Sequence, residues 1–156
     1  MNSTENSTSG FGGFEKQLRL RVYQHILRAG RIPAIEELAD EFSMPAEEIR
    51  AGLQKLEQGH ALVLQPSGEI LRAAPFWAAP TPFTVECERI SWWASCIWDA
   101  LGVPAMLQMD ARIGTSCGCC GEDMSFNVNV AAPRMPQGVI HFAVPARRWY
   151  ENIAFT

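Results

Sequence analysis

A fourteen-residue stretch, Ser91 to Pro104, constrains the fold most strongly, because it holds three of the chain's five tryptophans. Large aromatic side chains contribute much of the energy of a buried core, so this stretch must be packed against other elements. One cysteine and one acid, Cys96 and Asp99, lie among the indoles. Residues 94–101 contain no helix breaker, whereas a glycine and a proline follow at once, so the sequence predicts a short helix that ends before Gly102.

Cys96 and Asp99 admit two interpretations. On a helix they would share a face, because they are three residues apart. In the first interpretation the cysteine is a small buried hydrophobe and the acid is solvated, since buried cysteines are common. In the second, Trp92, Trp93 and Trp98 form a wall that excludes water and favours a neutral, proton-donating Asp99, and Cys96 is a nucleophile or a ligand for a soft metal. The chemistry alone leaves both open.

Composition limits the function classes. The chain has 156 residues, of which 47% are hydrophobic and 19% charged, which suits one or two small domains. The net charge of -4 argues against nucleic acid as the main partner, and no apolar run is long enough for a membrane span. The polar N-terminus lacks a signal sequence, and the five cysteines are an odd number. We therefore expect a cytoplasmic protein with reduced thiols.

The first half of the chain follows the pattern of a winged helix. After a disordered tail over residues 1–13, apolar residues at helical spacing predict helices over 14–28, 34–42 and 45–58, followed by short strands over 61–64 and 70–71. The third helix carries more acids than bases, so a packing or lid role is favoured over DNA reading.

The second half is predicted to be a small β-rich domain. A Pro/Ala-rich linker over residues 74–82 separates the winged-helix-like domain, 14–73, from a domain over 83–156. The expected class is α+β, with a small mixed or antiparallel sheet and short helices. The predicted strands are 83–87, 110–115, 124–130, 138–144 and the start of one over 153–156, with a short helix over 145–150.

A turn between two of these strands is rich in thiols. Cys117, Cys119 and Cys120 lie within four positions flanked by glycines. Such a turn could bind zinc, copper or mercury through thiolates. It is not a zinc finger, because a closed site needs four ligands and the three histidines are isolated from one another.

The segment from Trp93 to Leu101, followed by Val103-Pro104-Ala105, resembles the active-site segment of the organomercurial (alkylmercury) lyases. In that family, a run of an aromatic residue, Ala, x, Cys, x, x, Asp, x and Leu carries a mercury-binding cysteine and the acid that protonates carbon. The strand pattern around 139–144 and the segment 148–156 also look like the family, as does the winged-helix-like start. The family cysteine that aligns with Cys117 is considered structural.

The resemblance implies protonolysis of a carbon–mercury bond. Cys96 would bind mercury as a thiolate, because soft thiolates select soft metals, and a second cysteine would bind it as well. Asp99 would accept a thiol proton and deliver it to the leaving carbon, and the wall of Trp92, Trp93 and Trp98 would hold the organic group. No cofactor is required. Hg(II) is the bound product, and free cellular thiols or a mercuric reductase would receive it.

The resemblance is incomplete at the C-terminus. The family's second reactive cysteine follows an apolar segment like Ile153–Thr156, where this sequence ends. Three explanations remain open: the chain is a fragment, a cysteine of the 117–120 turn replaces the missing one, or the gene continues through a UGA codon read as selenocysteine. In the second explanation Cys119 and Cys120, which are not part of the family motif, capture or relay metal.

Two non-enzymatic readings compete with the lyase. One is a thiol-based, metal-responsive winged-helix regulator, which would explain the N-terminal pattern and the cysteine turn. The other is a metal-binding relic that kept the fold and lost turnover. The regulator does not explain an acid beside Cys96 among indoles, and the acidic third helix counts against it. The missing second cysteine favours the relic. The lyase is the first hypothesis.

Overall fold

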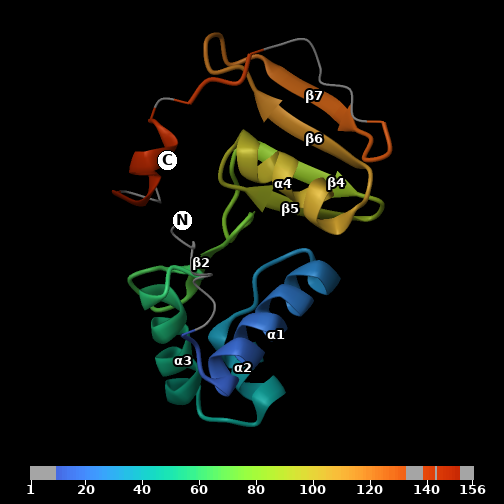
Figure 1. Cartoon of the computed structure of the whole chain (residues 1–156). Helices are drawn as coiled ribbons and strands as arrows, with labels where there is room; N and C mark the ends of the chain where they lie inside the picture. The colour runs from blue at the N-terminus through green and yellow to red at the C-terminus, as the bar shows by residue number, and fades with distance from the viewer. Residues whose placement is uncertain (1–9, 133–138, 143, 152–156) are drawn as a thin grey trace, which may run out of the picture. The chain divides into compact units, whose positions relative to one another are not determined.

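The computed structural model describes residues 10–132, 139–142 and 144–151. The chain divides into two compact units between Ala79 and Pro80. The first is mainly helical and the second is built on a sheet (Figure 1). The mixed α and β content that the sequence predicts is confirmed. No helix among the described residues is both long and apolar enough to span a membrane.

Three helices form the core of the first unit, and they agree with the predicted helices to within one residue at each end. They are α1 (Gly13–Ala29), α2 (Ile35–Phe42) and α3 (Ala46–Gln58). The four-residue spacing of Leu18, Val22 and Ile26 places all three on one buried stripe, with exposures of 0%, 1% and 0%. The facing side chains of the other two helices are also fully buried: Ile35, Leu38, Ile49, Leu53 and Leu56.

Three short strands follow α3 and extend beyond the predicted pair. They are β1 (Val63–Leu64), β2 (Ile70–Ala73) and β3 (Phe76–Trp77), and each is antiparallel to the next. The prediction that residues 74–82 form only a linker is wrong, because β3 lies within this segment. Phe76 is 1% exposed and its ring lies edge-on to Tyr23, whose hydroxyl donates a hydrogen bond of 2.8 Å to the Ala74 carbonyl. Burial of an aromatic ring thus draws this segment into the first unit.

The predicted disordered tail also needs correction at its end. Residues 1–9 lie outside the described residues, but Phe11 is described, and it packs against the turn after α3. A Cβ added at Gly59 would lie 2.3 Å from Cζ of Phe11, so the ring occupies the space that this glycine leaves. Residues 11–13 are therefore part of the folded unit.

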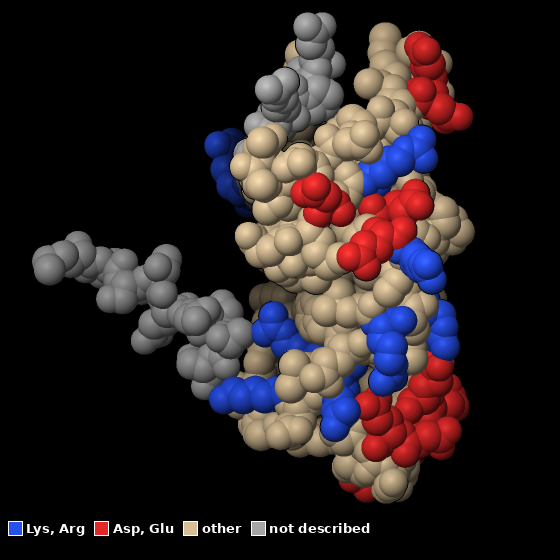
Figure 2. Space-filling view, turned by 90° about the vertical axis from the view of Figure 1, so that its right-hand side faces the viewer, with Lys and Arg blue, Asp and Glu red and all other residues tan. Residues whose placement is uncertain are grey.

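The basic side chains of α3 are paired with acids. Lys55 Nζ lies 2.9 Å from Glu15 Oε1, and Arg50 lies 3.9 Å from carboxylate oxygens of both Glu36 and Glu47. Figure 2 accordingly shows acidic side chains beside basic ones on the visible part of the helical unit. Helix α3 therefore does not present a uniformly basic surface.

Glu37 gives the first unit a predictable dependence on pH. Its carboxylate accepts two hydrogen bonds from Arg31, one of them 2.7 Å long, and another of 2.9 Å from the Ala34 N–H at the start of α2. These contacts, that with Arg31 foremost, lower the pKa of Glu37 from 4.5 to about 2. Because the folded state holds the charged form, the stabilisation is present above pH 4.5 and is lost as the pH falls towards 2.

We therefore expect Glu37→Gln to flatten the loss of stability over this pH range, as measured by urea unfolding at a series of pH values. Glu36→Gln, which alters a mostly exposed carboxylate of the same helix, is the control and should keep the wild-type slope. Equal slopes for wild type and Glu37→Gln would contradict the prediction.

The second unit is a four-stranded antiparallel sheet with one helix across it. Its strands are ordered β5-β4-β6-β7, and helix α4 lies on one face (Figure 1). Residues beneath the helix, such as Val85, Trp92 and Ile113, are buried. The elements are β4 (Phe83–Cys87), β5 (Ile90–Ala94), α4 (Ile97–Leu107), β6 (Ala111–Ser116), β7 (Asp123–Val128) and a 3-10 helix, Ala146–Glu151.

The strand predicted over 138–144 is not observed. Residues 139–142 and 144 have no regular secondary structure, and Val139 is 94% exposed. Their apolar alternation is typical of a strand, but a strand forms only against a hydrogen-bonded neighbour, and no described strand pairs with this segment. The predicted strand over 153–156 lies outside the described residues.

Candidate active site

Cys96 lies where a strand gives way to a helix. Strand β5 ends at Ala94 and α4 begins at Ile97, and Cys96 directly precedes the helix in an extended conformation, with φ -153° and ψ 176°. The predicted helix over 94–101 therefore begins too early. The reason is non-local, because residues 90–94 pair along their whole length with β4, and tryptophan favours strands.

The same helix continues past its predicted end. Gly102 and Pro104 lie inside α4, which reaches Leu107. An internal proline costs about 3 kcal/mol because it removes a hydrogen bond and crowds the preceding turn. Pro104 is nevertheless buried with Ala100 and Val103, so packing against the sheet outweighs the local preference.

Asp99 is buried in the first turn of α4. It is 7% exposed, and the Ser95 hydroxyl donates a short hydrogen bond to its Oδ2. The Ala100 N–H donates to the Cys96 carbonyl at 2.9 Å, which closes the turn around the two functional groups. A half-buried thiol and a buried acid thus flank one helix start.

The three indoles do not form one wall, which corrects the prediction. Trp92 lies opposite Val85 and Trp93 opposite Thr84, so these adjacent indoles project from opposite faces of the sheet. Trp92 is buried beneath α4 at 5% exposure, whereas Trp98, in the first turn of the helix, is 60% exposed. Because the segment is a strand, the side chains alternate instead of sharing a helical face.

The sheet brings the cysteine turn to the same edge as Cys96. Strands β5 and β6 flank β4 and are both antiparallel to it, so they end on the same side. Cys96 follows β5 and Cys117 follows β6. Because β4 lies between these strands, two strand spacings, about 10 Å, separate the backbones at the two cysteines. Cys87 ends β4 at the opposite edge, where it is 2% exposed and burial raises the pKa of its thiol.

The turn between β6 and β7 is closed by two backbone hydrogen bonds. The Cys117 N–H donates to the Glu122 carbonyl and the Gly121 N–H donates to the Cys117 carbonyl, both at 2.8 Å. Gly121 has a φ of 73°, a left-handed conformation that glycine adopts without strain. Hydrogen bonds to the Cys117 sulfur, from the backbone of Cys120 and Cys119 and from the Cys120 thiol, lower the pKa of Cys117.

The predicted metal ligands Cys96, Cys117, Cys119 and Cys120 do not converge on one point. Among the described residues, no three His, Cys, Asp or Glu side chains are placed to hold a metal ion together. Cys119 and Cys120 are exposed and Cys117 is half-buried.

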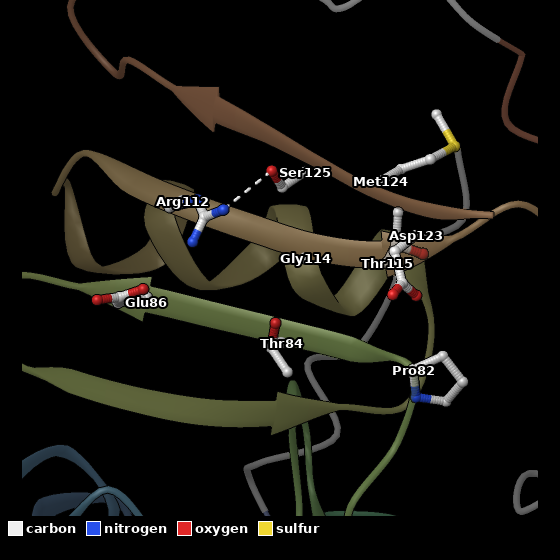
Figure 3. Close-up of a pocket in the computed structure, with 9 residues that line it drawn as sticks. All are labelled: Pro82, Thr84, Glu86, Arg112, Gly114, Thr115, Asp123, Met124 and Ser125. Carbon is white, nitrogen blue, oxygen red and sulfur yellow. Dashed lines mark hydrogen bonds between the residues drawn. The ribbon is translucent and has the colours of Figure 1, made fainter.

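Sequence reasoning missed a polar pocket on the face of the sheet away from α4 (Figure 3). The hollow has a volume of about 340 Å³, and the Arg112 guanidinium in it donates to the Ser125 hydroxyl at 3.1 Å. The sequence signal for this pocket was the alternation of polar residues along β4 and β6. That signal is not sufficient, because only the pairing of the two strands brings these residues together. The lining residues are Pro82, Thr84, Glu86, Arg112, Gly114, Thr115, Asp123, Met124 and Ser125.

Comparison with known proteins finds similarity over most of the chain. The family model described as "Alkylmercury lyase" matches residues 76–156. Proteins named alkylmercury lyase from Bacillus cereus and Clostridium butyricum are each 28% identical over 126 residues, which is 80% of this chain and 55% of the relative. The chain thus spans about half the length of the curated relatives it matches.

A solved structure, titled "Crystal structure of the mercury-bound form of MerB2", has the same fold. It superposes with a TM-score of 0.63 at 16% identity, over 83% of this chain and 62% of that chain. The family match covers 81 of the 156 residues, more than half, and includes β4, β5, α4 and both Cys96 and Asp99. The chain therefore belongs to the alkylmercury lyase family.

Proposed function

We propose that this protein is an organomercurial lyase that cleaves carbon–mercury bonds by protonolysis. The observation that carries the proposal is the placement of the buried Asp99 carboxyl and of Cys96 in one turn at the start of α4. A buried acid needs hydrogen-bonding partners and is rare without a role, and here it lies beside the softest nucleophile among the side chains.

The proposed reaction balances without an oxidant. The Cys96 thiolate displaces the exchangeable ligand of the substrate and forms a mercury–sulfur bond. A second thiol then binds mercury, and its proton passes to Asp99. Asp99 delivers that proton to the carbon, the carbon–mercury bond breaks, and a hydrocarbon leaves. Mercury remains as Hg(II) on two thiolates, and Asp99 returns to its ionised form.

The second thiolate is best supplied by the turn between β6 and β7. Among the described cysteines outside this turn, Cys87 is buried at the other edge of the sheet. The turn cysteines share the edge with Cys96, and Cys117 begins the turn. We propose that mercury is bound by Cys96 and by one thiolate from Cys117, Cys119 and Cys120.

The organic group is proposed to contact Trp98. Its indole is 60% exposed and lies in the same helical turn as Asp99, whereas Trp92 is part of the core. An apolar surface beside the acid would exclude water and favour proton transfer to carbon.

We also propose a cytoplasmic role in detoxification. We propose that the first unit is winged-helix-like and acts in packing, because the basic side chains of its third helix are paired with acidic side chains. That pairing disfavours a regulator that reads DNA, since phosphate binding needs lysine and arginine side chains that are not neutralised by acids. No cofactor is proposed. Free thiols or a mercuric reductase would take up Hg(II).

Incubation of the purified chain with phenylmercury and excess free thiol tests the proposal. We expect benzene, detected by gas chromatography, and we expect Cys96→Ser to abolish it because the mercury ligand is lost. Cys87→Ser, which changes a buried cysteine at the other edge, is the control and should still release benzene. Tight mercury binding with no benzene from the wild-type chain would instead support the binding relic.

A further inference from the structure

We propose that Cys117 and Cys120 form a two-thiolate site for a soft, two-coordinate metal ion such as Hg(II), and that Cys119 lies outside this site. The site would bind inorganic Hg(II) whether or not the chain cleaves carbon–mercury bonds. Only its role as acceptor of the lyase product rests on the proposed function.

The backbone of the turn selects this pair from the three cysteines. The hydrogen bond from the Gly121 N–H to the Cys117 carbonyl spans four residues, as in one turn of a helix. In such a turn, residues three apart share a side, whereas residues two apart do not. Cys117 and Cys120 are three apart, and Cys119 is two residues from Cys117.

The side chains of the two cysteines interact. The Cys120 thiol donates a hydrogen bond to the Cys117 sulfur, which also accepts from the backbone N–H groups of Cys120 and Cys119. A two-coordinate metal ion would replace the proton between the sulfurs, and the two cysteine side chains would move apart to admit it. Because no third ligand converges with them among the described residues, the geometry suits an ion that takes two thiolates rather than zinc, which takes four.

The turn is also placed to receive metal. Cys120 is exposed and Cys117 half-buried, so the pair is accessible, and the closed hairpin holds it at the edge of the sheet shared with Cys96. Transfer is a ligand exchange: each new mercury–sulfur bond to Cys117 or Cys120 forms as one bond of the product complex breaks. The proton of the Cys120 thiol passes to a released thiolate, and nothing is oxidised.

The test uses mercuric chloride in a Cys96→Ser background, so that cleavage chemistry is not needed. After reduction and removal of reductant, each variant is loaded with Hg(II), challenged with excess 2-mercaptoethanol and weighed by native mass spectrometry. We expect one retained mercury in the background chain and after the matched change Cys119→Ser. Cys117→Ser and Cys120→Ser should each weaken retention by roughly 100-fold or more, because a chelate becomes a single-thiolate ligand.

Two outcomes would overturn the site: loss of mercury in Cys119→Ser equal to that in Cys120→Ser, or no retention in the background chain. Circular dichroism of each variant shows whether the fold is retained, and Cys119→Ser matches the other two in chemistry and location. Phenylmercury cleavage by the wild-type chain is measured in parallel. Retention of mercury without cleavage of phenylmercury would contradict the lyase activity and support the two-thiolate site. Cleavage without retention would contradict the site and support the lyase activity.

Discussion

Asp99→Asn is expected to lower the rate of benzene release from phenylmercury by about 100-fold or more, because a general acid contributes at least that factor. Mercury binding should be unchanged, since the thiolates remain. The loss would appear in the cleavage step alone. Single-turnover experiments with the chain in excess over phenylmercury separate it from product release.

The variant is informative because asparagine fits the same site. The Ser95 hydroxyl donates to Oδ2 of Asp99, and an asparagine side-chain oxygen can accept that hydrogen bond in the same place. Asn cannot deliver a proton to carbon. A drop in rate with unchanged mercury stoichiometry would therefore report the missing proton and not a displaced helix.

Asp110→Asn provides the matched control. Asp110 is exposed, and its Oδ1 accepts a hydrogen bond of 2.9 Å from the Val130 N–H, which an asparagine can also accept. This variant should release benzene at the wild-type rate. If Asp99→Asn also did so, Asp99 would not be the proton donor, and the buried acid would have a structural role at the helix start.

The helices of the first unit could be predicted from the sequence because their signals are local. Apolar residues four apart fall on one stripe of α1, and Gly30 follows the helix in a left-handed conformation with a φ of 72°. Neither signal depends on what the helix packs against. The strand β3 lacked such a signal, because the burial of Phe76 depends on Tyr23, fifty-three residues earlier.

The candidate site shows the limit of the same reasoning. The spacing of Cys96 and Asp99 correctly indicated that one turn could hold both, but the strand over 90–94 is set by pairing with β4. That pairing sends Trp92 and Trp93 to opposite faces, which helical spacing could not predict. The shared edge of Cys96 and Cys117 likewise follows from strand order, to which adjacent residues give no clue.

Leu18→Ala is expected to destabilise the first unit by about 2–5 kcal/mol. Leu18 is fully buried on the stripe of α1, and a Cβ added at Gly52 of α3 would lie 2.8 Å from its Cδ2. The two helices therefore approach closely at this leucine. Truncation removes buried methyl groups and leaves a cavity that the surrounding side chains fill only in part.

Leu20→Ala is the control within the same helix. Leu20 is 54% exposed, so the same chemical change should alter stability by no more than about 0.5 kcal/mol. Alanine also has the higher helix propensity, and that difference is equal in the two variants. Urea unfolding followed by circular dichroism at the helical band measures both, with the slope against urea checked for constancy.

The comparison of the two leucines tests the packing of the helical unit itself. A large loss for Leu18→Ala with little change for Leu20→Ala would mean that α1 is held by its buried stripe. Similar losses for both would mean that the opposite face of α1 is also covered in solution. In that case the surface that carries Leu20 would be an interface, and the burial assigned to α1 would be wrong.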